Sequence, residues 1–169
     1  MATLIRGGTV VTAEGTLDAD VVIEGEKIAA LLARGAATIG SAYDIIDATD
    51  LYVIPGGIDA HTHMEMPFGG TFSVDTFETG TKAAAWGGTT TIIDVAVQAK
   101  GTSRLAALDK WHSKADGNCA IDYGFHMIVS DVNDGTLKEM DACIAAGISS
   151  FKMFKIGRAS CRERVCMLV

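Results

Sequence analysis

The chain has 169 residues, of which 49% are hydrophobic and 21% are charged, so its composition is that of a folded protein rather than a disordered one. A net charge of −7 without a basic stripe argues against a surface that binds DNA or RNA. No apolar run approaches the roughly 18 residues of a membrane helix and the first residues lack a signal-peptide pattern, so we expect no membrane partner and a cytoplasmic location.

Residues 1–54 form the first recognisable part of the chain. Short β-type runs such as TVVT and VVIEG alternate there with turn residues. This pattern predicts a small antiparallel sheet.

From Pro55 onward the pattern changes to apolar strands that alternate with helical stretches, which is typical of βαβ units and a parallel sheet. Strands are expected at 57–61, 89–97, 120–129 and 149–154, and helices at 76–86, about 103–115 and about 136–146. We expect Asp75 to cap the first helix, with Glu78 completing a capping-box-like start. Such a series amounts to about half of an eight-stranded barrel of roughly 250 residues.

The motif with the clearest chemical meaning is DAHTH, which ends the first strand after Pro55. Strand periodicity places Asp59, His61 and His63 on one face, so the two imidazoles can point at one ion. Such barrels build their active sites at the C-terminal ends of strands. A lone HxH often lies on a surface, but the in-phase Asp59, the strand end and the glycine-rich loop that follows indicate metal ligation.

A second signal is Lys152, which stands inside the apolar run Ile148–Phe154. A lysine within a buried strand is costly to keep charged, whereas one that extends to the surface from a strand end is not. Local sequence alone favours the surface alternative, and the presence of the DAHTH motif in the same chain reverses that preference. A neutral amine can add carbon dioxide to give a carbamate, whose oxygens can bridge two metal ions roughly 3.5–4 Å apart.

Three further polar residues have less specific interpretations. His112 falls in the middle of a predicted helix and is expected at the surface. His126 lies in a predicted strand, where a hydrogen-bonded or pocket-adjacent histidine is favoured over a ligand. Asp94 ends a strand and either supports the metal ligands or caps a helix, and we favour the cap.

Four segments together resemble the dihydropyrimidinase and D-hydantoinase family of cyclic amidohydrolases. They are GGIDAHTHMEMPFGGT, GTKAAAWGGTTTIID, DYGFHMIV and SSFKMF, which match in order and spacing over essentially 1–154. The resemblance implies an α/β fold with a metal-dependent (β/α)8 hydrolase barrel, of which 55–154 would be the first half. Residues 1–54 would then be a portion of a small β-sandwich domain.

The same resemblance implies a binuclear zinc centre. His61 and His63 would bind the more buried ion, and a carbamylated Lys152 would bridge the two zinc ions. Met64, Met66 and Phe68 would form an apolar loop that lines the substrate pocket, with Met64 and Phe68 as substrate contacts. Ordinary loop packing is an equal alternative for them. The family's remaining ligands and its catalytic aspartate come from later strands, so no catalytic residue is assigned in this chain.

The implied reaction is hydrolysis of the ring amide of a small cyclic substrate, such as dihydrouracil or a hydantoin, to an N-carbamoyl amino acid. A homo-oligomer, specifically a tetramer, is implied as well. Two alternatives remain open: another cyclic amidohydrolase, such as an allantoinase or dihydroorotase, and a non-catalytic oligomeric scaffold of the same fold. A scaffold would be expected to lack His61, His63 and Lys152.

The pattern is lost abruptly after Phe154. Residues 156–165, IGRASCRERV, match the translation of a common sequencing adapter. Lys155 is the residue that the junction encodes when the adapter interrupts an expected methionine codon. We therefore expect 155–169 to be a non-native, adapter-derived tail, and the chain as given to be too short for the whole enzyme and inactive by itself.

Overall fold

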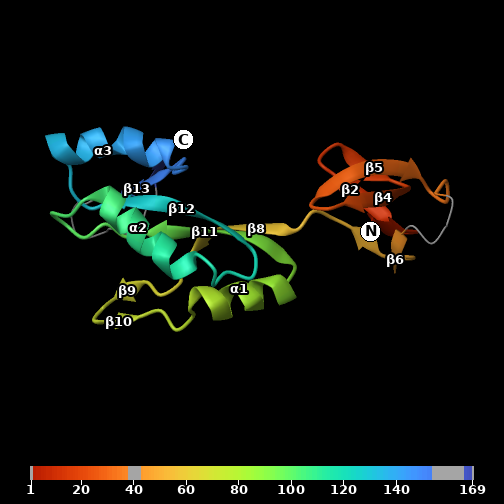
Figure 1. Ribbon diagram of the computed structural model, residues 1–169, viewed down its shortest axis with the longest axis horizontal. Helices are drawn as coiled ribbons and strands as arrows, with labels where there is room; N and C mark the ends of the chain where they lie inside the picture. The colour runs from red at the N-terminus through yellow and green to blue at the C-terminus, as the bar shows by residue number, and fades with distance from the viewer. Residues whose placement is uncertain (1, 38–42, 154–165, 169) are drawn as a thin grey trace. The chain divides into compact units, whose positions relative to one another are not determined.

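The computed structural model describes residues 2–37, 43–153 and 166–168. It divides into two compact units, Met1–Pro55 and Gly56–Val169 (Figure 1). The expected adapter-derived tail, 155–169, lies outside the described residues except for 166–168. None of the described helices is long and apolar enough to span a bilayer.

In the described part of the first unit the strands form two sheets. The larger has the order β5-β4-β1-β6 and contains β1 (Ala2–Arg6), β4 (Ala19–Glu24), β5 (Lys27–Ala33) and β6 (Tyr43–Asp47). The smaller has the order β3-β2-β7 and contains β2 (Thr9–Thr12), β3 (Gly15–Leu17) and β7 (Tyr52–Val53). Val10 of β2 and Val21 of β4 are buried in one cluster, so the two sheets share a small core.

The prediction of a small antiparallel sheet in this unit holds for its hairpins but not for all of its strands. The short turns do join antiparallel neighbours, because β2 pairs with β3 and β4 pairs with β5 in that sense. However, β6 pairs with β1 and β7 pairs with β2 in parallel, after longer connections. Parallel pairing requires such a crossover connection, which local turn signals do not reveal.

The second unit is a partial β/α barrel, as predicted. Its parallel strands have the order β13-β12-β11-β8 and are β8 (Gly57–Thr62), β11 (Thr89–Ala96), β12 (Asp122–Val129) and β13 (Phe151–Met153). Between them lie α1 (Phe77–Trp86), α2 (Arg104–Ala115) and α3 (Asp134–Ala145). The limits of these elements differ from the predicted ones by at most two residues at each end.

Two smaller elements accompany this barrel segment. The hairpin β9 (Pro67–Phe68) and β10 (Thr71–Phe72) follows β8, and β14 (Cys166–Leu168) pairs antiparallel with β13.

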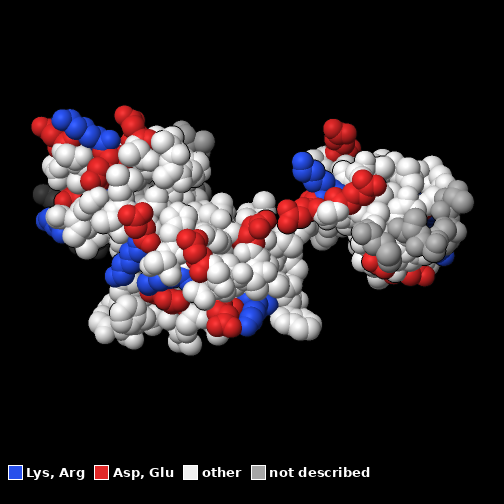
Figure 2. All heavy atoms as spheres, in the orientation of Figure 1, with Lys and Arg blue, Asp and Glu red and all other residues white. Residues whose placement is uncertain are grey.

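On the face seen in Figure 2, the Lys and Arg side chains of this unit are interspersed with Asp and Glu side chains.

The helices pack on the sheet through one apolar cluster. Trp111 and Leu108 of α2 lie against the sheet, and Ile92 of β11 and Met127 of β12 belong to the same buried cluster. Figure 1 shows α2 crossing these two strands. Full burial of a large apolar side chain contributes roughly 1.5–3 kcal/mol, so this cluster fixes α2 against the strands.

A buried polar network joins the loops that follow β11 and β12. Nε2 of Gln98 donates to the carbonyl of Thr102 and to Oδ1 of Asp131. The buried guanidinium of Arg104 donates to the carbonyl oxygens of Asp131 and Thr136. The C-terminal ends of neighbouring strands are thereby held at one edge of the sheet.

Helix α1 begins one residue later than the sequence suggested. Thr76, not Asp75, is the N-cap, and it forms a capping box with Thr79 rather than with Glu78. The carbonyl of Asp75 instead accepts a hydrogen bond from the amide of Glu65, which keeps the chain extended up to Thr76. Glu78 pairs with Lys82 on the helix surface.

Thr76→Ala is expected to lower the free energy of unfolding of the intact protein by about 1 kcal/mol, because the amide of Thr79 loses its acceptor. Asp75→Ala is expected to cost less than about 0.5 kcal/mol, the usual range for an exposed position. Urea-induced unfolding of both variants measures the difference. A larger loss in Asp75→Ala than in Thr76→Ala would contradict the capping assignment.

Candidate metal centre

Three predicted site residues converge at the C-terminal ends of the barrel strands. His61 lies at the end of β8, His63 follows it, and Lys152 lies in β13. Nε2 of His61 is 3.1 Å from Nε2 of His63 and 3.2 Å from Nζ of Lys152. The fold therefore brings Lys152 to the histidine motif across the two intervening strands β11 and β12.

The two imidazoles have a spacing that suits one metal ion. Zn–N bonds of about 2.0–2.1 Å in tetrahedral geometry place two ligand nitrogens about 3.3–3.4 Å apart. The observed 3.1 Å separation is close to that value. Imidazole nitrogen is a favoured ligand of zinc, whereas an ammonium group has no lone pair to donate, so Lys152 suits the site only as a neutral amine or a carbamate.

Among residues 2–37, 43–153 and 166–168, no cluster of three or more His, Cys, Asp or Glu side chains is assembled for a metal ion. Cys119 and Cys143 line neither of the two cavities at the histidine motif. Burial raises the pKa of Cys119 to about 11, and burial also raises the pKa of Cys143. The nitrogen atoms that converge at the motif are those of the two imidazoles and of the lysine.

Strand β8 contains an irregularity next to His61. Ile92 of β11 pairs with Asp59, but Asp94, two residues later, pairs with Thr62, three residues later on β8. One extra residue is thus accommodated between Asp59 and Thr62. Such bulges bend a strand and redirect its side chains, and they occur frequently beside active sites.

Asp94 is a buried acceptor beside this segment, and the prediction that it caps a helix was wrong. Its Oδ2 accepts hydrogen bonds from Oγ1 of Thr62 at 2.9 Å and from the amide of Met64 at 2.7 Å. Its Oδ1 accepts a hydrogen bond from Nε1 of Trp111 at 3.2 Å. Asp94 lies inside β11 and α2 begins ten residues later, so its carboxylate is directed at β8 and the side of α2.

His126 is a hydrogen-bonded residue next to the pocket, as predicted. Its Nε2 lies 2.8 Å from the carbonyl oxygen of Ala60, and its Nδ1 contacts Oγ of Ser150. It lines a cavity of about 170 Å³ together with His61 and Lys152. His112, in contrast, lies in α2 with its side chain 40% exposed, as expected for a surface position.

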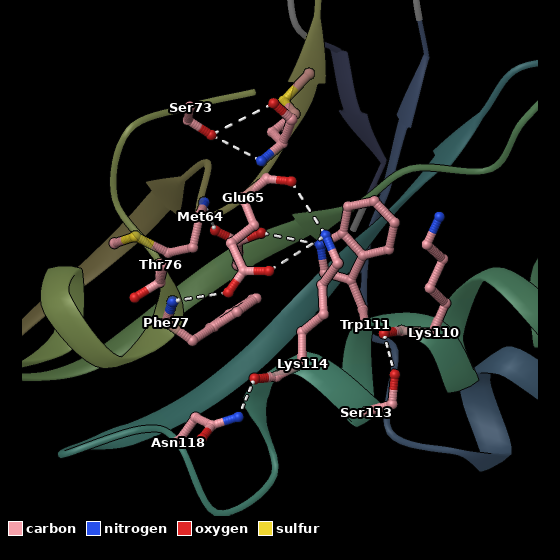
Figure 3. A network of polar contacts seen from close by, with 12 residues as sticks. Met64, Glu65, Ser73, Thr76, Phe77, Lys110, Trp111, Ser113, Lys114 and Asn118 are labelled. Carbon is pink, nitrogen blue, oxygen red and sulfur yellow. Dashed lines mark hydrogen bonds and ion pairs between the residues drawn. The ribbon is translucent and has the colours of Figure 1, made fainter. Parts of the chain in front are cut away.

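The backbone leaves the extended conformation at Glu65, two residues after His63. Glu65 has φ of 50°, in the left-handed region that is unusual for a residue other than glycine. Nζ of Lys114 donates to the carbonyl of Glu65 at 3.1 Å and lies 3.7 Å from Oε2 of Glu65 (Figure 3). The amide of Phe77 donates to Oε1 of Glu65 at 3.4 Å, so several contacts hold this strained turn.

A larger cavity of about 500 Å³ opens beside the three nitrogen groups. Its lining consists of His61, His63, Met66, Phe68, Thr71, Phe72, Ser73 and Lys152. Phe68 lies on the β9–β10 hairpin and lines this cavity, and its contact with substrate stays a prediction. Met66, from the same predicted pocket loop, lines the cavity too. Phe72 also lines it but was not assigned, although its apolar character close to that loop was a usable signal.

Met64 is absent from the described residues that line the larger cavity, as the loop-packing alternative expects, and its contact with substrate stays a prediction. It packs against the apolar core, and its sulfur lies beside Gly80 of α1, where a Cβ atom would meet it at 2.4 Å. The left-handed backbone of Glu65 separates Met64 from Met66, which does line the cavity.

Comparison with known proteins assigns the family. The model of the amidohydrolase family matches residues 52–159, which is more than half of the chain. The chain belongs to the amidohydrolase family. This amidohydrolase is 64% identical over 154 residues to a D-hydantoinase of Streptomyces coelicolor, covering 90% of this chain and 33% of that protein. It is 44% identical to a dihydropyrimidinase of Rattus norvegicus, covering 89% and 30% of the two chains.

Solved structures agree with this assignment. The crystal structure of dihydropyrimidinase from Brevibacillus agri matches this amidohydrolase with a TM-score of 0.87 and 50% sequence identity, covering 95% of this chain and 34% of that one. A crystal structure of D-hydantoinase matches with the same TM-score and 43% identity. The chain spans about a third of the length of the curated relatives that it matches.

The different positions of Met64 and Phe68 predict different effects on stability. Met64→Ala is expected to lower the free energy of unfolding by about 2 kcal/mol, because it leaves a void beside α1. Phe68→Ala is expected to change it by less than about 0.5 kcal/mol, since the side chain of Phe68 is 79% exposed. Denaturant unfolding of the intact protein tests this ranking, and equal losses in the two variants would contradict the described placement of Met64.

Proposed function

We propose that the whole protein hydrolyses the ring amide of a dihydropyrimidine or a hydantoin to an N-carbamoyl amino acid. The observation that carries this proposal is the convergence of His61, His63 and Lys152, with nitrogen separations of 3.1 and 3.2 Å, beside an apolar cavity. The 64% identity to a D-hydantoinase supports the same reaction class.

We propose that two zinc ions occupy this centre. His61 and His63 would hold one ion through their Nε2 atoms, and Lys152, carbamylated at Nζ, would bridge both. When bound, the ions would supply Lewis-acid polarisation of the ring carbonyl and lower the pKa of a water molecule. Carbamylation converts a cationic side chain into an anionic one, so it would also remove the unfavourable charge of an ammonium group beside a metal.

The chain's own contribution to substrate binding would come from the β9–β10 hairpin. Met66, Phe68 and Phe72 present apolar surface to the larger cavity, which suits an apolar ring substituent and excludes water from the reacting centre. Oγ of Ser73 donates to the carbonyl of His63 at 2.6 Å and accepts from the amide of Met66. The hairpin is therefore fastened to the histidine motif itself.

An allantoinase or dihydroorotase would use the same kind of metal centre on more polar rings, and product analysis with each ring separates these reactions from the proposed one. A metal-free scaffold is distinguished by metal content. The homotetramer and the inactivity of the 169 residues by themselves stay predictions. Measurements of oligomeric state and of turnover test them directly. The cytoplasmic location also stays a prediction.

In the intact protein, His61→Ala and His63→Ala are each expected to reduce bound zinc and to lower kcat for dihydrouracil hydrolysis by more than roughly 100-fold. The reason is that each variant removes one of two nitrogens that face the same ion. Elemental analysis and a ring-opening assay provide the two readouts. His112→Ala is the matched control, because His112 lies on α2 outside the site. Near-normal turnover by a metal-depleted His63→Ala protein would overturn the assignment.

Lys152→Ala is expected to lose activity that short carboxylic acids partly restore, because an added carboxylate can take the place of the carbamate. Lys152→Arg is expected to stay inactive, since its guanidinium cannot form a carbamate. Turnover measured with and without added acetate or propionate tests both statements. Full activity of Lys152→Arg would show that the carbamate proposal is wrong.

A further inference from the structure

The two histidines of the motif alternate with residues that are held by side chains from other elements. His61 and His63 direct their Nε2 atoms toward each other, at 3.1 Å. Ala60, Thr62 and Met64 lie between and beside them, and each makes a hydrogen bond with His126 or Asp94. The segment is therefore held on both sides of each candidate ligand.

His126 holds the segment at the irregularity of β8. A bulge leaves the extra residue without its regular ladder partner, so its backbone groups are free to bond with a side chain. The carbonyl oxygen of Ala60, inside this irregular stretch, lies 2.8 Å from Nε2 of His126. His126 thus stabilises the carbonyl immediately before His61.

The same contacts define which nitrogen of His126 carries the proton. A carbonyl oxygen can only accept, so Nε2 must donate to Ala60. In the neutral ring Nδ1 is then the acceptor, and the hydroxyl of Ser150 donates to it. Ser150 lies two residues before Lys152, so one imidazole connects β8 to the segment that carries the lysine.

Asp94 holds the segment on the other side of His61 and around His63. Its side chain is fully buried, and Oδ2 accepts from Thr62 and Met64, the residues that flank His63. Its Oδ1 is fixed by the indole of Trp111, a side chain that is 2% exposed. The carboxylate therefore has a fixed direction.

Helix α2 also contacts the turn that follows His63. Nζ of Lys114 lies 4.7 Å from the centre of the Trp111 ring and donates to the carbonyl of Glu65. Figure 3 shows Trp111 and Lys114 beside the turn formed by Met64 and Glu65. The turn that follows His63 is thus tied to the helix that orients Asp94.

We propose that His126 and Asp94 are positioning residues of the metal centre, which hold Ala60, Thr62 and Met64 so that His61 and His63 aim their Nε2 atoms at one ion. This inference rests on the proposed function, because it assumes that the two histidines bind metal. It assigns to His126 and Asp94 no contact with substrate or metal. They act through hydrogen bonds to the backbone of Ala60 and Met64 and to the hydroxyl of Thr62.

The test uses Co²⁺ as the only metal added to the intact protein after its own metal is removed. Co²⁺ affinity is measured by competition with a chelator, ligand geometry by the visible absorption spectrum, and stability by thermal unfolding of the metal-free protein. His126→Phe keeps a planar ring but removes both hydrogen bonds, and it is expected to weaken Co²⁺ binding roughly 10- to 100-fold and to change the spectrum. His126→Gln, whose amide can still donate to Ala60, is expected to recover most of the affinity.

Asp94→Asn provides a second, nearly isosteric variant. In either orientation its NH2 group faces a donor, Trp111 on one side or Met64 on the other, so one set of contacts is lost. We expect a similar weakening of Co²⁺ binding. Asp131→Asn is the matched control, because Asp131 accepts from Gln98 and Gly101 but does not touch the histidine segment. It is expected to lower thermal stability without changing the Co²⁺ spectrum.

Unchanged Co²⁺ affinity and spectrum in folded His126→Phe and Asp94→Asn proteins would overturn the positioning role. If His126→Phe does not fold, Asp94→Asn decides alone. His63→Ala is measured in parallel: if it too leaves Co²⁺ binding unchanged, the proposed metal centre itself has failed. Loss of binding in His63→Ala with none in the other variants overturns the positioning role only.

Discussion

The buried carboxylate of Asp94 connects the strand, the turn and the helix that surround the candidate metal centre. Each of its oxygens is occupied, because Thr62 and Met64 donate to one and Trp111 donates to the other. A buried polar group that loses its partner costs about 1–3 kcal/mol, so none of these contacts is easily exchanged. The position of the histidine motif is thereby linked to the apolar packing of α2, since Trp111 belongs to the core cluster.

The second constraint is the geometry of a parallel sheet. Strands connected by helices all point the same way, so their C-terminal ends meet at one edge, and the twist of the sheet curves that edge. His61 and Lys152 are far apart in the sequence and lie on strands separated by two others, yet their nitrogens are 3.2 Å apart. A site of this kind requires the curved sheet, because neither strand alone contains it.

Much of the second unit was predictable, for identifiable reasons. The alternation of apolar runs and helical stretches after Pro55 specified the parallel segment, and residue spacing of two placed His61 and His63 on one face. The role of Asp94 was not predictable from local sequence, because its partners Met64 and Trp111 are distant in the chain. Its hydrogen bonds exist only once β8, β11 and α2 are packed together.

The errors share a cause, since each depends on a contact or conformation that local pattern does not encode. Next to the cap at Thr76, the carbonyl of Asp75 accepts a hydrogen bond from the amide of Glu65, a residue ten positions earlier. In the first unit, the parallel pairing of β6 with β1 and of β7 with β2 depends on connections longer than a turn.

A single metal centre made by the histidine motif and Lys152 can be seen by X-ray diffraction at the zinc absorption edge, from crystals of the intact protein grown with zinc. We expect one anomalous peak about 2.0–2.1 Å from Nε2 of both His61 and His63. We expect a second peak roughly 3.5–4 Å from the first, with carbamylated Lys152 between them. An active crystalline protein without anomalous density at His61 and His63 would contradict this expectation.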